Sequence, residues 1–182
     1  TSLDESITKN ITINLESGYP LRVTEGDISI SNATINGMIN VSSATLTLGT
    51  GSKIQGSLYI EDSSSVTIDG GIIIGTGSSA CAVYVSNSTL NFNSGSVSYD
   101  GSIKIGIIAR NNSVINYNGG TTTSTGEYSR GIDIEYSTLD ISGGTIYGQY
   151  KGIYSENSDI TAEPPGRIKS GNVSDHVYSS GG

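Results

Sequence analysis

Two carboxylates, Asp133 and Glu135, stand two residues apart in a stretch where apolar and polar residues alternate. In an extended strand, residues two apart point to the same side and lie ~7 Å from each other. An inverting glycosidase holds its acid and its base ~6.5–9.5 Å apart, on either side of the sugar and the attacking water. The pair therefore has the spacing for hydrolysis of a glycosidic bond, although a solvated polar strand face presents the same two residues.

Tyrosines occur in the same alternating pattern. Together with the carboxylates they form the candidate ligand-binding set Tyr59, Tyr84, Asp133, Glu135, Tyr154 and Glu156. An aromatic ring covers the apolar C–H surface of a sugar, while neighbouring polar groups hydrogen-bond its hydroxyls. These residue types indicate carbohydrate binding, and stacked tyrosines that merely stabilise a parallel sheet are the structural alternative.

Metal and cofactor chemistry has no comparable pattern. The chain has one histidine, His176, and one cysteine, Cys81, which excludes an internal disulfide and suits a small buried role. The calcium-binding nonapeptide repeat is absent, and we find no cluster of aspartates. The sequence therefore predicts no catalytic residue with support beyond spacing, no metal site and no cofactor.

The elements that must position the candidate residues are the strands of a repeat. An apolar anchor recurs every 20 to 25 residues, at Leu21, Leu46, Val66, Leu90, Ile115, Leu139 and Ile160. A serine stands two residues before most anchors, and Gly, Ser and Asn separate the apolar runs. Alternation with period two inside such a repeat predicts short strands, three to a coil, stacked into a solenoid.

This repeat predicts an all-β single domain over residues 1–182, with about seven short coils. Residues 1–10 lie outside the repeat and are expected to form an N-terminal cap or edge strand, and residues 172–182 a polar cap or tail. Residues 32–36 are expected to form a turn-rich bridge between the first two coils. The register places the six candidate residues on the outer face of the first strand of each coil. It also places Arg110 beside Glu135, so we expect an exposed ion pair worth ~0.2–1 kcal/mol.

Composition limits the partners. The net charge is −8 and the nine Lys and Arg residues are scattered, which excludes a nucleic-acid-binding stripe. No run of ~20 apolar residues predicts a membrane span, and no signal peptide is visible. The chain begins at Thr1, which suggests a processed protein or an excised fragment. Its acidic, Ser-, Thr-, Asn- and Gly-rich composition is typical of cell-surface solenoids, so we expect an extracellular or cell-surface location.

Coils of three short strands with Gly-, Ser- and Asn-rich turns resemble the right-handed parallel β-helix of the pectin-lyase-like superfamily, over roughly residues 11–171. Asn87, Asn112 and Asn157 share one turn position, which is similar to the asparagine ladders of these solenoids, and Tyr136 interrupts the series. The strands VYV and TLNF and the SGGTI-type turns are similar to those of bacterial surface adhesins. The resemblance implies a right-handed parallel β-helix, most like an adhesin-type solenoid.

The same superfamily includes enzymes that cleave acidic polysaccharides. The tripeptide Arg167-Ile168-Lys169 is similar to the RIK motif of polygalacturonase-type hydrolases, but their NTD, DD and GHG motifs are absent. No coil is long enough to supply the loops that wall a catalytic cleft. A row that reads TLT, SVT, TLN, VIN, TLD and DIT resembles the Thr-x-Thr ladders of ice-binding solenoids, and is better explained as a polar face that keeps a flat sheet soluble.

We therefore expect a non-enzymatic extracellular β-helix module of a bacterial cell-surface protein, acting as an adhesive, carbohydrate-binding or spacer domain. Its expected partners are glycans or a host or matrix surface. The alternative is a polysaccharide-active glycoside hydrolase or lyase of the same fold. The sequence feature that discriminates between the two hypotheses is loop length at the turns, which argues against the enzyme.

Overall fold

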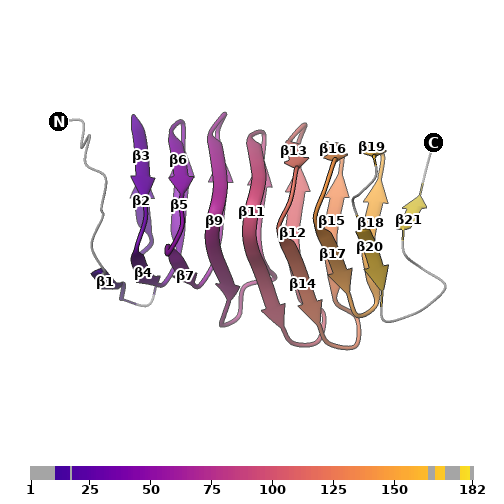
Figure 1. The fold of residues 1–182 in the computed structure, drawn as a ribbon, viewed down its shortest axis with the longest axis horizontal. Helices are drawn as coiled ribbons and strands as arrows, with labels where there is room; N and C mark the ends of the chain where they lie inside the picture. The colour runs from indigo at the N-terminus through magenta and orange to yellow at the C-terminus, as the bar shows by residue number, and fades with distance from the viewer. Residues whose placement is uncertain (1–10, 17, 164–166, 171–176, 181–182) are drawn as a thin grey trace.

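The chain winds into a β-solenoid whose strands lie side by side along a rod (Figure 1). The computed structural model describes residues 11–16, 18–163, 167–170 and 177–180, and these residues form strands and turns with no helix among them. Every strand pair is parallel, as the pairings from β1 with β4 to β18 with β21 show. The all-β right-handed parallel β-helix predicted from the sequence is confirmed, with about six turns rather than about seven.

One side of the tube is an eight-stranded sheet, and it carries the candidate residues. Its strands, in order along the rod, are β2 (Leu21–Val23), β5 (Ile39–Ser42), β8 (Leu58–Glu61), β10 (Cys81–Ser86), β12 (Ile105–Arg110), β15 (Arg130–Glu135), β18 (Lys151–Glu156) and β21 (Val177–Ser180). Strand β21 lies within the segment 172–182 that was expected to be a cap or tail.

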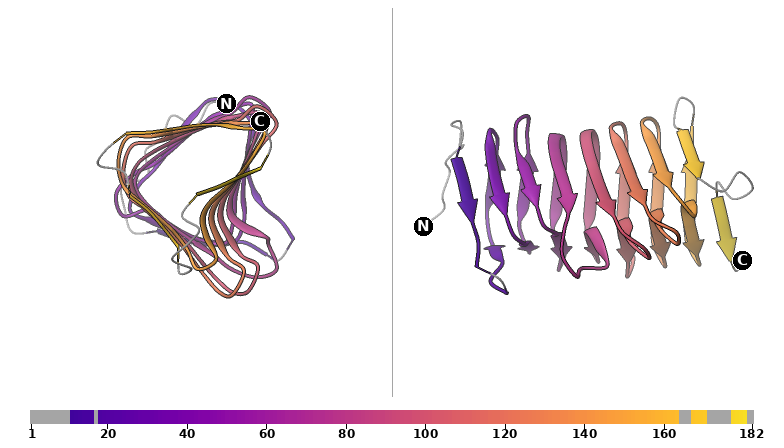
Figure 2. Two further views of the ribbon diagram at one scale, coloured as in Figure 1. Left: turned by 90° about the vertical axis from the view of Figure 1, so that its right-hand side faces the viewer. Right: turned by 90° about the horizontal axis from the view of Figure 1, so that it is seen from below.

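The other two sides form a thirteen-stranded sheet that turns one corner of the tube (Figure 2). The first of them, the anchor ladder, holds β3 (Asp27–Ile30), β6 (Thr45–Leu48), β9 (Ser65–Gly75), β11 (Thr89–Asp100), β13 (Val114–Tyr117), β16 (Thr138–Ile141) and β19 (Asp159–Ala162). The second holds β1 (Ile11–Asn14), β4 (Ala33–Asn36), β7 (Lys53–Gln55), β14 (Thr121–Thr125), β17 (Thr145–Gly148) and β20 (Arg167–Ser170). Strands β9 and β11 run on through the corner and pair on both sides, which joins the two ladders.

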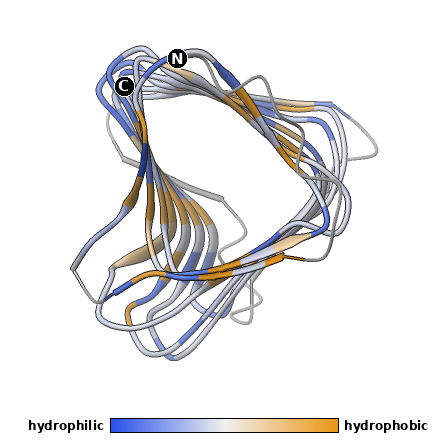
Figure 3. Cartoon of the chain, turned by 90° about the vertical axis from the view of Figure 1, so that its left-hand side faces the viewer, coloured by the Kyte–Doolittle hydropathy of each residue, from blue (hydrophilic) through white to orange (hydrophobic). Residues whose placement is uncertain are grey.

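The interior is a stack of mainly aliphatic side chains contributed by alternate residues of the strands. Figure 3 shows the hydrophobic residues recurring along the sides of the tube from coil to coil. In the strand β15, Ile132 and Ile134 are completely buried, as the alternation predicts. Phe92 and Tyr117 are also fully buried and meet edge to face with ring centroids 4.9 Å apart. Burial of one such side chain stabilises the fold by about 1.5–3 kcal/mol, so a thin core suffices when each coil repeats it.

The corner between the eight-stranded sheet and the anchor ladder is built from serine and from residues with a left-handed backbone. Four serines two positions before the anchors are buried, at Ser64, Ser88, Ser113 and Ser137. Ser137 is the clearest example, because its Oγ accepts a hydrogen bond from the backbone N–H of Ser113 at 3.1 Å and donates one to the carbonyl of Glu135 at 3.0 Å. This arrangement pairs backbone groups at a corner where the strand ladder is interrupted. One residue earlier, φ is positive at Ser43, Ser63, Asn87, Asn112, Tyr136 and Asn157.

The sequence-based register of the first coil is wrong. Leu21 does not belong to the anchor ladder, because it pairs with Ile39 in the eight-stranded sheet. Ile28 is the true first anchor and pairs with Leu46, only 18 residues later. The expected bridge at 32–36 contains strand β4, which pairs with β1 and β7. The error arises because LRV and DISI both alternate, so periodicity alone fits either segment. Residues 1–10, the expected N-terminal cap, lie outside the described residues.

Candidate functional site

The six predicted ligand-binding residues share the outer face of the eight-stranded sheet, as predicted. Tyr59 pairs with Tyr84 in the strand register, Asp133 pairs with Tyr154, and Glu135 pairs with Glu156. Ile108 stands between Tyr84 and Asp133 and completes one continuous row. The structure divides this row into two parts with different surroundings.

The first part is an aromatic pair. The rings of Tyr59 and Tyr84 lie with centroids 5.6 Å apart and planes tilted by 42°, and both side chains remain partly exposed. Partial burial raises the pKa of Tyr59, against the effect of its hydrogen bond with Ser79. Beside the pair, the amide of Asn40 donates to Glu61 at 2.7 Å. This part of the face offers ring surface next to an amide and a carboxylate.

The second part is an ionic cluster of Arg110, Arg130, Asp133 and Glu135. Asp133 points outward from β15 but is only 2 % exposed, because two guanidinium groups cover it. Arg110 Nη2 lies 2.6 Å from Asp133 Oδ1, and Arg130 bonds the other carboxylate oxygen. The predicted pair of Arg110 with Glu135 is confirmed, with Nε and Oε2 3.2 Å apart. The expectation that Asp133 lies on a solvated face is wrong, because it rested on strand direction and took no account of arginine reach.

This arrangement decides what Asp133 can do chemically. A general acid or base must come within hydrogen-bond reach of the group whose proton it moves. Both oxygens of Asp133 are bonded to arginine, and the side chain is closed to solvent. Glu135 is more accessible, with 35 % of its side chain exposed, but it is also bonded to Arg110. The pair has the spacing of a glycosidase site without an open carboxylate at the Asp133 position.

Cations and aromatic rings continue the closed region toward the C-terminal end. The guanidinium carbon of Arg130 lies 4.0 Å from the centroid of the Tyr154 ring, and Lys151 Nζ lies 5.5 Å from the same ring. Lys151 is 6 % exposed, which is low for a lysine. The hydroxyl of Tyr154 reaches Glu156 at 3.4 Å. In this part of the row, the charged and aromatic side chains therefore contact one another.

Other chemistry finds little support in the described residues. They contain no group of three or more His, Cys, Asp or Glu side chains that could hold a metal ion. They also form no helix that could cross a membrane. Burial raises the pKa of the Cys81 thiol to about 12, so it is a poor nucleophile near neutral pH. The backbone of Arg167–Ser170 forms β20, and His176 lies outside the described residues.

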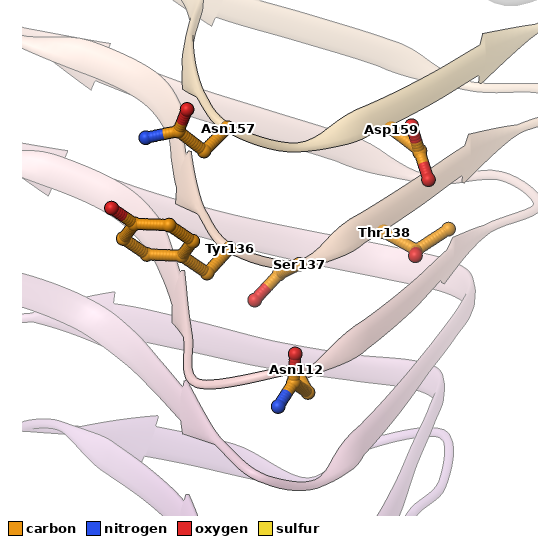
Figure 4. A pocket seen from close by; sticks show the side chains of 6 residues that line it. All are labelled: Asn112, Tyr136, Ser137, Thr138, Asn157 and Asp159. Carbon is orange, nitrogen blue, oxygen red and sulfur yellow. The ribbon is translucent and has the colours of Figure 1, made fainter.

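A shallow depression that the sequence did not predict lies on the corner beside the ionic cluster, and we call it the turn-edge depression (Figure 4). Its volume is about 240 Å³, and its lining residues are Asn112, Tyr136, Ser137, Thr138, Asn157 and Asp159. Tyr136 is 56 % exposed and lies on the coil between those that carry Asn112 and Asn157. Ser137 takes part in the buried serine ladder, whereas the other five side chains form no hydrogen bond with the described residues.

The sequence held one signal for this depression, which is the interruption of the asparagine series by Tyr136. Asn adopts a left-handed backbone readily because its short polar side chain can hydrogen-bond locally. Tyr136 occupies the same position with φ of 47°, where a bulky residue is an outlier. A departure of this kind from a repeat is informative when the position has a known backbone requirement.

Comparison with known proteins does not add to this picture. No protein-family model, no curated protein and no solved structure matches the chain. The parallel β-solenoid fold therefore rests on the structure, and the likeness to the pectin-lyase-like superfamily and to adhesins rests on the sequence resemblance.

Proposed function

We propose that this chain is a non-enzymatic, extracellular β-helix module of a bacterial cell-surface protein, and that it binds carbohydrate on the outer face of its eight-stranded sheet. The observation that carries the proposal is the partly exposed pair of Tyr59 and Tyr84, with ring centroids 5.6 Å apart. Such rings cover the C–H face of a sugar, and the adjacent Asn40 and Glu61 can hydrogen-bond its hydroxyls.

Charge favours a neutral glycan as the ligand. The chain carries a net charge of −8, so a polyuronate or a nucleic acid would be repelled at long range. Arg110 and Arg130, which could have offset this repulsion, are committed to Asp133. The tyrosine pair carries no charge of its own near neutral pH.

Affinity at such a face is weak. An open sheet buries little of a ligand, and the loss of translational and rotational freedom must be offset by the few contacts made. We expect a Kd between micromolar and millimolar, about −4 to −8 kcal/mol. Weak sites of this kind become effective when a cell surface displays many copies, because each bound copy raises the effective concentration of the next.

The rod shape supports a spacer role for the same module. Strands β1 and β21 lie at opposite ends of the rod (Figure 1), so the described part of the chain advances from one end to the other. Six turns at ~4.8 Å each extend it by roughly 29 Å. Spacing and binding are compatible, since a sheet face along a rod remains accessible at any height.

The test is a screen against neutral and acidic glycans, followed by titration of a binding glycan. Tyr84→Ala should weaken binding at least tenfold and leave the unfolding transition in place. Tyr19→Ala is the matched control, because Tyr19 is 72 % exposed and belongs to neither the pair nor the ionic cluster. Equal binding by wild type and Tyr84→Ala would refute the proposed face. Release of oligosaccharide that disappears in Glu135→Gln would instead establish the glycoside hydrolase or lyase.

A further inference from the structure

We infer that the turn-edge depression is a second carbohydrate subsite, which accepts one uncharged sugar ring stacked on Tyr136. The ligand class rests on the proposed function, but the site is separate from the tyrosine pair. It lies on the corner between the eight-stranded sheet and the anchor ladder, whereas Tyr84 and Tyr59 lie on the sheet, one and two coils before the coil of Asn112.

The first argument is that Tyr136 occupies a position that its residue type fits poorly. The other residues that adopt the left-handed backbone at this turn position are serine or asparagine. The backbone of Tyr136 is held in place from both sides: its N–H donates to the carbonyl of Glu156 at 3.1 Å, and its carbonyl accepts from the N–H of Asn112 at 2.7 Å. The surrounding coils therefore impose the left-handed conformation, which is strained for a tyrosine and lowers the stability of the fold.

Neither core packing nor ring stacking among the described residues offsets that cost. Tyr136 is 56 % exposed, it is absent from the buried core, and its ring meets no other aromatic ring of the described residues. A large aromatic residue in a strained position, with its ring in solvent, breaks a local rule without a structural gain. Such departures concentrate at functional sites.

The second argument is the supply of unused polar groups around the ring. The side chains of Asn112, Thr138, Asn157 and Asp159 make no hydrogen bond with the described residues, although asparagines elsewhere on the rod do. The amide of Asn116, for example, donates to Asn91 one coil away at 2.8 Å. Tyr136 lies on the coil between Asn112 and Asn157, so these two amides cannot hydrogen-bond to each other as Asn116 and Asn91 do (Figure 4). They remain available to donate to and accept from sugar hydroxyls.

Size and charge narrow the ligand further. A volume of about 240 Å³ lies below the ~300–1,000 Å³ of pockets that enclose drug-sized molecules, so the depression suits one ring of a longer chain. Asp159 contributes a carboxylate to the lining and no basic residue lines it. A uronic acid is therefore disfavoured, and a neutral hexose or N-acetylhexosamine fits the groups present.

Thermal unfolding tests the strain. Tyr136→Asn restores the residue type preferred at this turn, and we expect a rise in Tm of roughly 2–4 °C. Asn87→Tyr is the mirror-image control, because Asn87 occupies the same turn position with φ of 48° and does not line the turn-edge depression. It should lower Tm by a similar amount. A lower Tm for Tyr136→Asn would overturn the inference, since it would mean that the ring stabilises the fold.

Binding is tested by NMR titration with methyl β-glucoside, methyl α-mannoside, N-acetylglucosamine and, as the charged comparison, glucuronic acid. With a neutral sugar, the side-chain amide signals of Asn112 and Asn157 should shift in a saturable way in the wild type and in Tyr136→Phe. The shifts should be lost in Tyr136→Asn. Silence of these amides for all neutral probes, or equal shifts with glucuronic acid, would overturn the subsite.

The same titration separates this inference from the proposed function. In Tyr84→Ala, the turn-edge amides should still respond, because the two sites share no residue. Response at the turn edge with no loss of affinity in Tyr84→Ala would refute the sheet face and support the subsite. Binding that depends on Tyr84 while Asn112 and Asn157 stay silent would refute the subsite and support the sheet face.

Discussion

The ionic cluster and the turn-edge depression are adjacent regions of one outer surface, and they use their polar residues in opposite ways. Glu135, which belongs to the cluster, immediately precedes Tyr136, which belongs to the depression. In the cluster, both oxygens of Asp133 are bonded and its side chain is closed to solvent. In the depression, five polar side chains have no partner among the described residues. Pointing outward from a solenoid is therefore different from being available to a ligand.

The difference follows from side-chain length. Neighbouring coils repeat at ~4.8 Å, a distance that an arginine spans easily. Arg110 reaches from β12 to Asp133 and Glu135 on β15, and so one coil closes over the next. Asparagine reaches only the equivalent residue on the adjacent coil, as Asn116 does with Asn91. Asn112 and Asn157, which lie on the coils on either side of Tyr136, make no such bond with the described residues.

The largest expected effect comes from opening the cluster completely. The double variant Arg110→Ala/Arg130→Ala removes both guanidinium groups that bond the carboxylate of Asp133 and cover it. A hydrogen bond to a charged group contributes about 1.5–3 kcal/mol, so the loss of both pairs should cost about 3–6 kcal/mol. We expect this loss in the free energy of urea unfolding. A cost below ~1 kcal/mol would show that the two pairs are no stronger than exposed ion pairs and that the cluster is not closed in solution.

Single variants compare the contributions of the individual ion pairs of the cluster to stability. Arg110→Ala removes a hydrogen-bonded ion pair with Asp133, which keeps Arg130, so we expect a cost of about 1.5–3 kcal/mol. This exceeds the ~0.2–1 kcal/mol expected from the exposed pair with Glu135 alone. Glu135→Ala is the control and should stay within that smaller range, because 35 % of its side chain is exposed. Equal costs for the two variants would mean that the buried contact adds nothing.

Most of the fold could be predicted from the sequence because every coil of a solenoid repeats the same residue pattern. From Leu46 onward, the alternation and the recurring serine specify which residues face inward, and Leu46, Leu90 and Leu139 are all completely buried. The first coil could not be predicted correctly because it is shorter than the rest. Without a neighbouring coil on its N-terminal side among the described residues, two alternating segments competed for one register.

For the candidate site, the sequence predicted the sheet face that carries the residues but not their burial or their contacts. Strand alternation placed Asp133 outward, but its burial depends on arginines from two other positions, and single-strand periodicity contains no such information. The depression depends on a turn whose backbone is left-handed at Tyr136. Without that φ, the interruption of the asparagine series looks harmless. With it, the interruption shows a bulky residue in a strained turn conformation.

An intermediate effect is expected from the buried thiol of Cys81, whose charge environment includes Arg110 and Asp133. Its pKa is raised from 9.0 to about 12, mainly by burial. Below pH 9 the thiol is protonated in both states, so its contribution to stability is fully present. As pH rises above 9, the unfolded chain loses this proton first and stability falls, by about 1 kcal/mol between pH 9 and 10 and by about 1.4 kcal/mol per pH unit between pH 10 and 12. Cys81→Ala should flatten this part of the urea-unfolding profile, and an unchanged slope would mean that the thiol is accessible.

The smallest expected effect is in the depression, and it tests whether its polar groups are truly unused. Thr138→Val keeps the branched shape that suits a strand and removes a hydroxyl with no partner among the described residues. We expect the free energy of unfolding to change by less than ~0.5 kcal/mol. Thr122→Val is the matched control, because Thr122 is completely buried and its hydroxyl is 3.0 Å from the Tyr117 hydroxyl. The same chemical change should cost about 1 kcal/mol there, through a lost hydrogen bond. If Thr138→Val costs as much as Thr122→Val, the hydroxyl stabilises the turn and the depression is as closed as the ionic cluster. If only Thr122→Val is costly, the Thr138 hydroxyl contributes nothing measurable to folding and remains available to a ligand.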